Sequence, residues 1–327
     1  MAYLVTGGAG FIGSHLVDRL IKDGEKVFVL DDLSTGSRAN LEHNASSALL
    51  EFVEGSTSDI DLVRELTAKV DTVFHLASAV GVQLVCDRPL DSLLANIHGC
   101  ENVITAASDM GVRLVFSSTS EIYGKNSNVA LAEDSDRVLG PLSKSRWSYA
   151  LAKSFGEMLC YELARTHGAR MAVVRLFNTV GPRQTGRYGM VLPTFVRQAV
   201  DGDDVTVYGD GSQSRCFIHV FDTVDALAKV ANADAAYGRA LNVGARTPIT
   251  IAELAKKVIE HAGSDSQISF VPYEDAYSTG FEELGSRQPD TTAIEAEIEW
   301  RPTLTIGEMI EDTIAYQRCH PAMTVAA

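Results

Sequence analysis

A tyrosine and a lysine lie four residues apart near the middle of the chain, at Tyr149 and Lys153. On a helix this spacing puts both side chains on one face, with their Cβ atoms about 5–6 Å apart. A free phenol has a pKa of about 10 and is a poor base at neutral pH, but a nearby ammonium group favours the phenolate. The pair therefore predicts a general base acting on a hydroxyl group, although the same spacing is common on ordinary amphipathic helices.

A run of hydroxyl side chains about thirty residues earlier favours the catalytic interpretation. Ser117, Ser118, Thr119 and Ser120 end an apolar run that is predicted to be a strand, and Glu121 follows them. Doubly wound folds bind their ligands at the carboxyl edge of the sheet. We therefore expect these hydroxyl groups at a ligand-binding edge.

Three glycines follow the first apolar run, within the segment Thr-Gly-Gly-Ala-Gly-Phe-Ile-Gly at residues 6–13. Gly7, Gly10 and Gly13 allow a tight turn, a close approach of the backbone to a pyrophosphate, and close packing of the next helix. The N-terminus of that helix supplies free N–H groups and a positive dipole for the phosphates. Because a strand and a helix flank the glycines, the segment predicts a dinucleotide site.

Two acidic residues, Asp31 and Asp32, end the second apolar run. A carboxylate at this place accepts hydrogen bonds from both hydroxyls of the adenosine ribose and repels a 2′-phosphate. The pattern therefore favours NAD over NADP.

The elements that must position these residues alternate along the first half of the chain. Apolar runs rich in Val, Leu and Phe, typical of strands buried on both faces, lie at residues 3–6, 27–30, 70–76, 113–118 and 171–177. Between them, apolar residues recur three and four apart, as on helices. The pattern predicts the α/β class: a Rossmann-type doubly wound parallel sheet, with an NAD-binding domain at residues 1–178. Residues 179–327 are expected to form a smaller α/β substrate domain that returns part of 216–250 to the first.

The composition excludes several other functional classes. The 327 residues include 28 Lys and Arg against 43 Asp and Glu, a formal charge of −15, which argues against nucleic acid as a partner. No apolar run reaches the roughly 18 residues of a membrane span. The five cysteines are far apart and odd in number, which is typical of reduced thiols and predicts a cytoplasmic protein. The eight histidines are scattered, so no metal site is expected.

Taken together, these motifs resemble the extended short-chain dehydrogenase/reductase family of nucleotide-sugar epimerases, dehydratases and decarboxylases. The resemblance spans essentially the whole chain. It also includes His75-Leu76-Ala77, Asn96 and the segments 117–124, 177–183 and 208–215. It implies a UDP-sugar substrate, a tightly bound and recycled NAD, and a homodimer formed through helices around residues 92–107 and 149–164.

The resemblance also assigns roles to particular residues. Tyr149 is expected to be the base on the sugar O4 hydroxyl, Lys153 to hold the nicotinamide ribose, and Thr119 to share the O4 hydrogen bond. Glu121 is the fourth residue expected to be catalytic. The expected cofactor contacts are Gly7, Gly10, Phe11, Ile12, Gly13, Asp31, Asp32, Asp59, Leu76, Ala77, Asn96, Ser117, Tyr149 and Lys153. The expected substrate contacts are Ser120, Asn178, Arg187, Val191, Tyr208, Arg215 and Arg287. Among them Asn178, Arg215 and Arg287 are expected to contact the nucleotide diphosphate.

One segment departs from the family pattern. Many members have Gly-Asp-x-x-Asp where this chain has Gly-Ser-Thr-Ser-Asp at residues 55–59. Ser56 therefore replaces the acid that usually faces the adenine.

The family's reactions share a first step, in which hydride leaves sugar C4 for NAD⁺ and Tyr149 takes the O4 proton. The sequence Thr119-Ser120-Glu121 is similar to UDP-glucuronate decarboxylases and hexose dehydratases. A dehydratase needs an Asp-Glu pair after the threonine, and the serine at position 120 argues against that reaction. Residues 138–147 and 273–290 are similar to the decarboxylase of the bacterial aminoarabinose pathway, which indicates a UDP-hexuronate.

The loop at residues 184–191 bears on the fate of the 4-keto sugar. Arg187 is a candidate clamp for a carboxylate or phosphate, because a guanidinium group binds either in a forked geometry. The loop resembles bacterial chains regarded as sugar epimerases, so we expect 4-epimerisation of UDP-glucuronate to UDP-galacturonate. A UDP-glucuronate decarboxylase, a UDP-glucose 4-epimerase and a non-catalytic NAD-binding regulator are the alternatives.

Overall fold

The centre of the protein is a sheet of seven strands in the order β11-β6-β5-β4-β1-β2-β3. Every neighbouring pair in it is parallel. The computed structural model describes residues 1–79, 88–128, 130–186, 190–272 and 287–321. The strands of this sheet are β1 (Ala2–Thr6), β2 (Lys26–Asp31), β3 (Leu50–Glu54), β4 (Thr72–His75), β5 (Arg113–Thr119), β6 (Met171–Leu176) and β11 (Ala240–Val243). The predicted α/β class and Rossmann-type parallel sheet are confirmed.

The strand order reverses beside β1. From β1 the chain moves outward through β2 and β3, and then continues on the other side through β4, β5 and β6. The crevice at the carboxyl ends of the strands around such a reversal is where doubly wound sheets bind their ligands. Thr6, His75 and Thr119 end β1, β4 and β5 and therefore lie at this edge.

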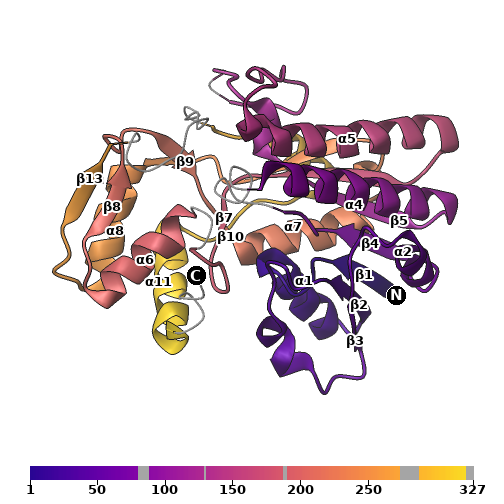
Figure 1. Ribbon diagram of the computed structural model, residues 1–327, viewed down its shortest axis with the longest axis horizontal. Coiled ribbons are helices and arrows are strands. Elements are labelled where there is room, and N and C mark those ends of the chain that lie inside the picture. Colours follow the sequence, from indigo (N-terminus) through magenta and orange to yellow (C-terminus); the bar gives the residue numbers. More distant parts are fainter. Residues whose placement is uncertain (80–87, 129, 187–189, 273–286, 322–327) are drawn as a thin grey trace.

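Helices cover both faces of the sheet. Successive residues of a strand point to opposite faces; accordingly Val5 packs in the core beneath α1 (Phe11–Lys22) and α7 (Val220–Asn232), whereas Leu4 packs in the core on the other face. That second face is covered by α2 (Ile60–Thr67), α4 (Pro89–Asp109) and α5 (Ser148–His167). Helices α4 and α5 run side by side (Figure 1). The continuous apolar strands of the sequence are thus buried on both faces.

A second, smaller core lies beyond the sheet, on the left in Figure 1. It is built from α6 (Val191–Asp201), α8 (Ile251–Ala262), α11 (Ile306–Cys319) and the parallel strands β8 (Val205–Tyr208) and β13 (Ile268–Val271). Two short strand pairs lie outside the large sheet: β7 (Thr179–Val180) with β10 (Ile218–His219), and β9 (Ser214–Cys216) with β12 (Pro248–Thr250).

Elements from the second half of the chain also complete the first sheet. Strand β11 pairs with β6, and α7 packs against α1. Both lie within residues 216–250. Helix α10 (Thr292–Ile298) contacts β11 as well. The core of the NAD-binding half therefore extends past residue 178, where the regular alternation of the sequence ends.

Two findings concern membranes and metal ions. None of the helices in the described ranges is long and apolar enough to cross a membrane. Among the same residues, no group of three or more His, Cys, Asp or Glu side chains is arranged to hold a metal ion.

Candidate active site

The turn after β1 is so tight that a side chain does not fit at two of its glycines. Gly7 has a φ of +72°, and a Cβ atom there would lie 2.7 Å from the backbone nitrogen of Ala77. A Cβ atom on Gly13 would lie 2.1 Å from the carbonyl oxygen of Gly7. Helix α1 begins at Phe11 with no side-chain cap and no acidic residue in its first turn. The first N–H groups of the helix, including that of Ile12, therefore lack a partner within the helix and suit a pyrophosphate.

Asp31 ends β2 beside this turn and supports it. Its carboxylate accepts hydrogen bonds from the N–H groups of Ala9, at 2.9 Å, and Leu33, at 2.8 Å. Burial raises the pKa of Asp31, and these two hydrogen bonds act against that rise. The residues fit NAD, because an acceptor carboxylate lies at the place that the ribose hydroxyls require. Asp32 instead accepts hydrogen bonds from the backbone and hydroxyl of Ser34.

The segment that departs from the family pattern is held by helices. Asp59 caps α2, since its carboxylate accepts a hydrogen bond from the N–H of Leu62 at 3.1 Å. The side-chain amide of Asn102 donates to the carbonyl groups of Thr57 and Ser58, at 3.0 and 3.1 Å. A contact between Asp59 and the cofactor stays a prediction.

The turn after β4 is tied to β1 and to helix α4. The N–H of Leu76 donates to the carbonyl of Thr6, at 3.1 Å, and the N–H of Ala77 donates to the Thr6 hydroxyl, at 3.3 Å. Asn96, which is 4% exposed, makes hydrogen bonds with both backbone groups of Ala79. Leu76, Ala77 and Asn96 therefore lie around the glycine turn, where the sequence predicts cofactor contacts.

Lys153 and Tyr149 lie on the face of α5 that packs against β5. A Cβ atom on Gly156 would lie 2.4 Å from the ring of Phe116, so this glycine lets the helix approach the strand closely. The Lys153 side chain is buried, and its Nζ donates to the carbonyl oxygen of Ser117 at 2.8 Å. The Thr119 side chain lies close to the Tyr149 hydroxyl, and Nζ of Lys153 lies 6.0 Å from the centre of the Tyr149 ring. The structure thus brings together four of the predicted residues: Ser117, Thr119, Tyr149 and Lys153.

The protein's own groups favour the uncharged forms of this pair. Burial raises the pKa of Tyr149, and the negative charge of Glu121 acts in the same direction. Burial also lowers the pKa of Lys153. The expected lowering of the Tyr149 pKa by Lys153 is not found, because the loss of solvent disfavours the phenolate more than neighbouring groups stabilise it.

Glu121, Arg146 and Arg287 form one charged side of the site, which we call the charged wall. In it two arginines pair with a single carboxylate. The Glu121 carboxylate pairs with Arg146 at 2.5 Å and with Arg287 at 2.7 Å, and Arg287 also donates to the Ser120 hydroxyl at 3.4 Å. Burial alone raises the pKa of Glu121, but Arg287 and then Arg146 outweigh it and hold the pKa at about 2. Glu121 is therefore a carboxylate at neutral pH.

This cluster contains more positive charge and more hydrogen-bond donors than its own residues use. Two guanidinium groups face one carboxylate. The Nε atoms of Arg146 and Arg287 and the indole nitrogen of Trp147 are buried and have no hydrogen-bond partner in the described structure. Unpartnered buried donors are costly, so an anionic ligand would stabilise this wall. Arg146 and Trp147 were not predicted from the sequence to belong to the site, although both lie within three residues of Tyr149.

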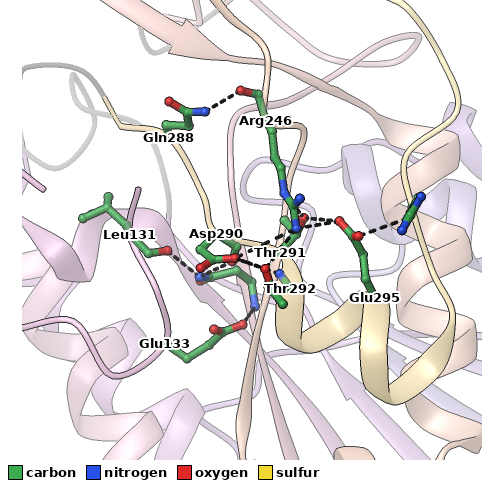
Figure 2. Close-up of polar contacts among 10 residues, drawn as sticks. Leu131, Glu133, Arg246, Gln288, Asp290, Thr291, Thr292 and Glu295 are labelled. Atoms are coloured by element: carbon green, nitrogen blue, oxygen red, sulfur yellow. Dashed lines mark hydrogen bonds and ion pairs between the residues drawn. The ribbon is translucent and has the colours of Figure 1, made fainter. Parts of the chain in front are cut away.

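Arg287 reaches this wall from a segment that is anchored on the first sheet. The N–H of Leu131 donates to the carbonyl of Gln288 at 2.8 Å, and the N–H of Asp290 donates to the carbonyl of Leu131 at 2.9 Å. Arg246 donates to the Thr291 hydroxyl at 2.8 Å and pairs with Glu295 at 2.7 Å (Figure 2). These contacts fix the position of the chain directly after Arg287.

The other predicted substrate residues lie on several elements. Arg215, in β9, forms an isolated parallel bridge with Arg287, which brings two of them together. The Asn178 amide donates to the carbonyl of Cys216 at 2.9 Å and so links the end of β6 to β9. Val191 begins α6 and packs on the second core, and Tyr208 ends β8. Arg187 lies outside the described residues.

A second buried ion pair, between Arg175 and Glu157, lies beside Ser118 and was not predicted. Arg175 donates to both oxygens of Glu157, at 2.8 and 3.0 Å, and to the Tyr123 hydroxyl at 2.9 Å. The Ser118 hydroxyl also donates to Glu157. Glu157 follows Lys153 by four residues, so the helix periodicity alone places it on the same face of α5.

Comparisons with known proteins agree with this geometry. The sequence profile of the NAD dependent epimerase/dehydratase family matches residues 3–244. The chain is 37% identical over 316 residues to a UDP-N-acetyl-alpha-D-glucosaminuronate decarboxylase of Bacillus cytotoxicus, a match that covers 96% of this chain and 97% of that protein. It is 33% identical over 315 residues to UDP-glucuronic acid decarboxylase 1 of Xenopus tropicalis, covering 96% of this chain and 72% of that protein. A crystal structure of UDP-glucose 4-epimerase from Thermotoga maritima, with UDP-glucose, matches with a TM-score of 0.88 at 30% identity and covers 98% of this chain and 100% of that one. The chain therefore belongs to the NAD-dependent epimerase/dehydratase family, and its cofactor is NAD.

Proposed function

We propose that this enzyme is a UDP-hexuronate decarboxylase. It oxidises C4 of UDP-glucuronate, or of a closely related UDP-sugar acid, and then releases the C6 carboxyl group as CO₂. The charged wall at Glu121 is the observation that carries the proposal.

The residues at the strand ends have distinct tasks in this reaction. NAD, when bound, accepts a hydride from C4 and later returns one, and its positive ring favours the phenolate of Tyr149. Tyr149 takes the O4 proton, and the Thr119 hydroxyl beside it orients O4. Lys153, held on the Ser117 carbonyl, lies where it can bind the nicotinamide ribose.

A carboxylate on the sugar would neutralise the surplus positive charge of the charged wall. Arg146 and Arg287 carry two positive charges against the single negative charge of Glu121. A buried surplus charge is strongly unfavourable unless a counter-charge pairs with it. A hexuronate supplies that counter-charge next to the oxidised carbon, whereas UDP-glucose has a hydroxyl there and carries its negative charge on the diphosphate.

The chemistry of the oxidised sugar then favours loss of CO₂. With a ketone at C4, the C6 carboxylate belongs to a β-keto acid. The C5–C6 bond can break, its electrons pass toward the C4 carbonyl, CO₂ departs and C5 takes up a proton. A wall of side chains linked by ion pairs holds the sugar in one orientation, which suits decarboxylation better than the rotation that an epimerase needs. The likeness of this chain to decarboxylases, two of which are named above, also supports decarboxylation over epimerisation.

Epimerisation at C4, which the sequence favoured, is the second candidate. The likeness to a UDP-glucose 4-epimerase at 30% identity supports it. The loop that contains Arg187, on which that expectation was based, lies outside the described residues.

Product analysis separates the two candidates. Purified protein is incubated with UDP-glucuronate, UDP-N-acetylglucosaminuronate and UDP-glucose, and the products are identified by mass spectrometry and proton NMR. Loss of the mass of CO₂ from a sugar acid supports the proposal. An unchanged mass with inverted C4 stereochemistry identifies an epimerase, and no product from any sugar, together with no absorbance from reduced nicotinamide, favours the non-catalytic regulator. Tyr149→Phe is the inactive control.

We also propose that the chain forms a homodimer through α4 and α5, which lie along one side of the molecule (Figure 1). Both helices expose large apolar side chains at positions three or four residues apart: Leu90 and Leu94 on α4, and Leu151, Phe155 and Met158 on α5. A stripe of this kind on two neighbouring helices is suited to packing against the same pair in a second copy.

A further inference from the structure

One buried asparagine is bonded to the segments that carry both Glu121 and Arg287. Asn242 lies in β11 and is fully buried. Its Nδ2 donates to the carbonyl oxygens of Leu131, at 2.8 Å, and Asp290, at 3.0 Å, and its Oδ1 accepts from the Tyr123 hydroxyl at 2.8 Å. A buried amide with bonds to three separate segments fixes those segments relative to one another.

Two of these bonds hold the segment that carries Arg287. Leu131 and Pro289 form an isolated parallel bridge, and Asn242 donates to one carbonyl group on each side of it. Arg287 precedes Pro289 by two residues, so its backbone starts from a point that this amide fixes. Arg246 anchors the same segment as well, but its side chain is 44% exposed.

The third bond reaches the short helix that carries Glu121. Tyr123 ends the 3-10 helix Ser120–Tyr123, two residues after Glu121. The Tyr123 hydroxyl accepts from Nη1 of Arg175 at 2.9 Å, and a guanidinium group can only donate. The phenol proton is therefore the one that goes to Asn242.

The Asn242 amide has one orientation that satisfies all three bonds. Turning it over would put Oδ1 against two carbonyl oxygens, which are acceptors like itself. Unpaired polar atoms in such a buried place carry the full cost of their lost hydration. The donors of the amide thus face the segment of Arg287, and its acceptor faces the helix of Glu121.

We propose that Asn242 is a positioning residue that sets where Arg287 lies relative to Glu121, and thereby the affinity of the site for an anionic sugar nucleotide. The inference rests on the proposed function for the identity of the ligand, but the placement of Arg287 does not depend on it. Arg287 donates to Glu121 at 2.7 Å, and its buried Nε has no partner in the described part of the chain. A guanidinium group binds a carboxylate or phosphate most strongly when two of its N–H groups point at the anion. A shift of the segment would weaken the pair with Glu121 and misdirect the remaining donor.

The test is a cycle of variants of the full-length protein without ligand, unfolded in urea at equal protein concentration. Asn242→Ser removes the amide but keeps the backbone N–H of this residue, which donates to the Glu133 carboxylate at 2.7 Å. Glu121→Gln raises the equilibrium constant of unfolding. This rise should be at least about fivefold smaller in the Asn242→Ser background, because a displaced Arg287 leaves Glu121 with less to lose.

A control cycle and a second variant complete this test. Asn242→Ser combined with Glu54→Gln, at a surface pair, should give independent effects on the unfolding constant to within about twofold. If the rise caused by Glu121→Gln is the same with and without Asn242, the proposal is wrong and the asparagine only stabilises the sheet edge. Should Asn242→Ser not fold, Tyr123→Phe replaces it, since it removes one oxygen and separates the amide from the helix of Glu121. The rise should then be at least about twofold smaller, and an equal rise again contradicts the proposal.

Ligand binding supplies a measurement that a general loss of stability does not change. Protein loaded with NADH, which cannot oxidise the sugar, is titrated with UDP-glucuronate in a calorimeter at a temperature where every variant is folded. Asn242→Ser should weaken this binding about tenfold in the wild-type background, and less than about threefold in the Arg287→Gln background, with the affinity for NADH unchanged. Equal weakening in both backgrounds would overturn the proposal. If wild-type protein binds no UDP-glucuronate, it is the proposed function that fails, and the unfolding cycle still decides the role of Asn242.

Discussion

Replacing Glu121 by glutamine should destabilise the protein by an amount that depends on pH. The substitution removes the carboxylate that pairs with both Arg146 and Arg287, which are almost fully buried. Breaking a buried ion pair by removing one partner typically costs about 3–5 kcal/mol. The pKa gives a second figure: it falls from an ordinary 4.5 to about 2, and a shift of this size corresponds to about 3 kcal/mol of stability. The two figures agree.

The sign of the pH dependence follows from the lowered pKa. A carboxyl group that ionises more readily in the folded state stabilises the fold fully above its unfolded pKa, and this contribution is lost as the pH falls through the folded pKa. For Glu121 that window runs from about 4.5 down to about 2. The free energy of unfolding of the wild-type protein should therefore exceed that of Glu121→Gln by about 3 kcal/mol at pH 7 and by about 1.5 kcal/mol at pH 3.

Urea unfolding, followed by circular dichroism at several pH values, measures this difference. The contributions of all other carboxyl groups cancel between wild type and variant. Glu54→Gln is the matched control, because Glu54 lies 3.9 Å from Arg38 and both side chains are at least 60% exposed. A surface pair of this kind contributes about 0–1 kcal/mol. The double variant Glu121→Gln with Arg287→Gln should be less unstable than the two single changes predict when added, since each partner is costly only while the other keeps its charge.

A free energy of unfolding for Glu121→Gln equal to that of the Glu54→Gln control at neutral pH would contradict this prediction. A difference in unfolding free energy from wild type that is the same at pH 7 and pH 3 would contradict it as well. In either case Glu121 would not hold a buried pair of arginines, and the surplus positive charge used to argue for a sugar acid would lose its basis.

Three further predictions concern the cofactor, the chemistry and the assembly. Tyr149→Phe should lower turnover by about 10²–10⁴-fold while NAD stays bound, as read from the absorbance of reduced nicotinamide and from cofactor retention; normal turnover would remove Tyr149 from the mechanism. Asp31→Ala should weaken NAD binding at least about tenfold in calorimetry, because the carboxylate supports the glycine turn and is expected to accept hydrogen bonds from the ribose. An unchanged affinity would show that the ribose is bound elsewhere. Met158→Glu, on the exposed stripe of α5, should convert a dimer into a monomer in light scattering, whereas the same change at exposed Met110, outside that stripe, should not; a dimer that tolerates the glutamate would place the interface elsewhere.

The cofactor half of the site could be predicted from the sequence because backbone geometry determines it. Gly7 and Gly13 leave no space for a Cβ atom, so few other sequences can form this turn. The four-residue spacing of Tyr149 and Lys153 fixes their common face as soon as the segment is a helix. These constraints act over a few residues and are visible without knowing the fold.

The charged wall could not be predicted, because its members come from distant parts of the chain. Arg287 reaches Glu121 across 166 residues, and its position depends on how the segment after it is anchored to Leu131 and Arg246. Strand β3 was missed for a different reason. Its residues Leu50–Glu54 lie at the edge of the sheet and include two glutamates among three apolar residues, so they lack the continuous apolar run of a central strand.

Glu121 was expected to be catalytic, and its two ion pairs limit how it could act. With a pKa of about 2 it carries no proton to donate at neutral pH, so it cannot serve as a general acid. To act as a base it must release an arginine, which would leave a buried cation unpaired. Only an incoming anion can take over that arginine without this cost. An anionic group of the bound substrate, either a carboxylate or the diphosphate, can therefore free one oxygen of Glu121. If the proposed sugar acid is the substrate, its carboxylate lies next to the reacting carbon, so the pairing would release Glu121 only when that group is in place.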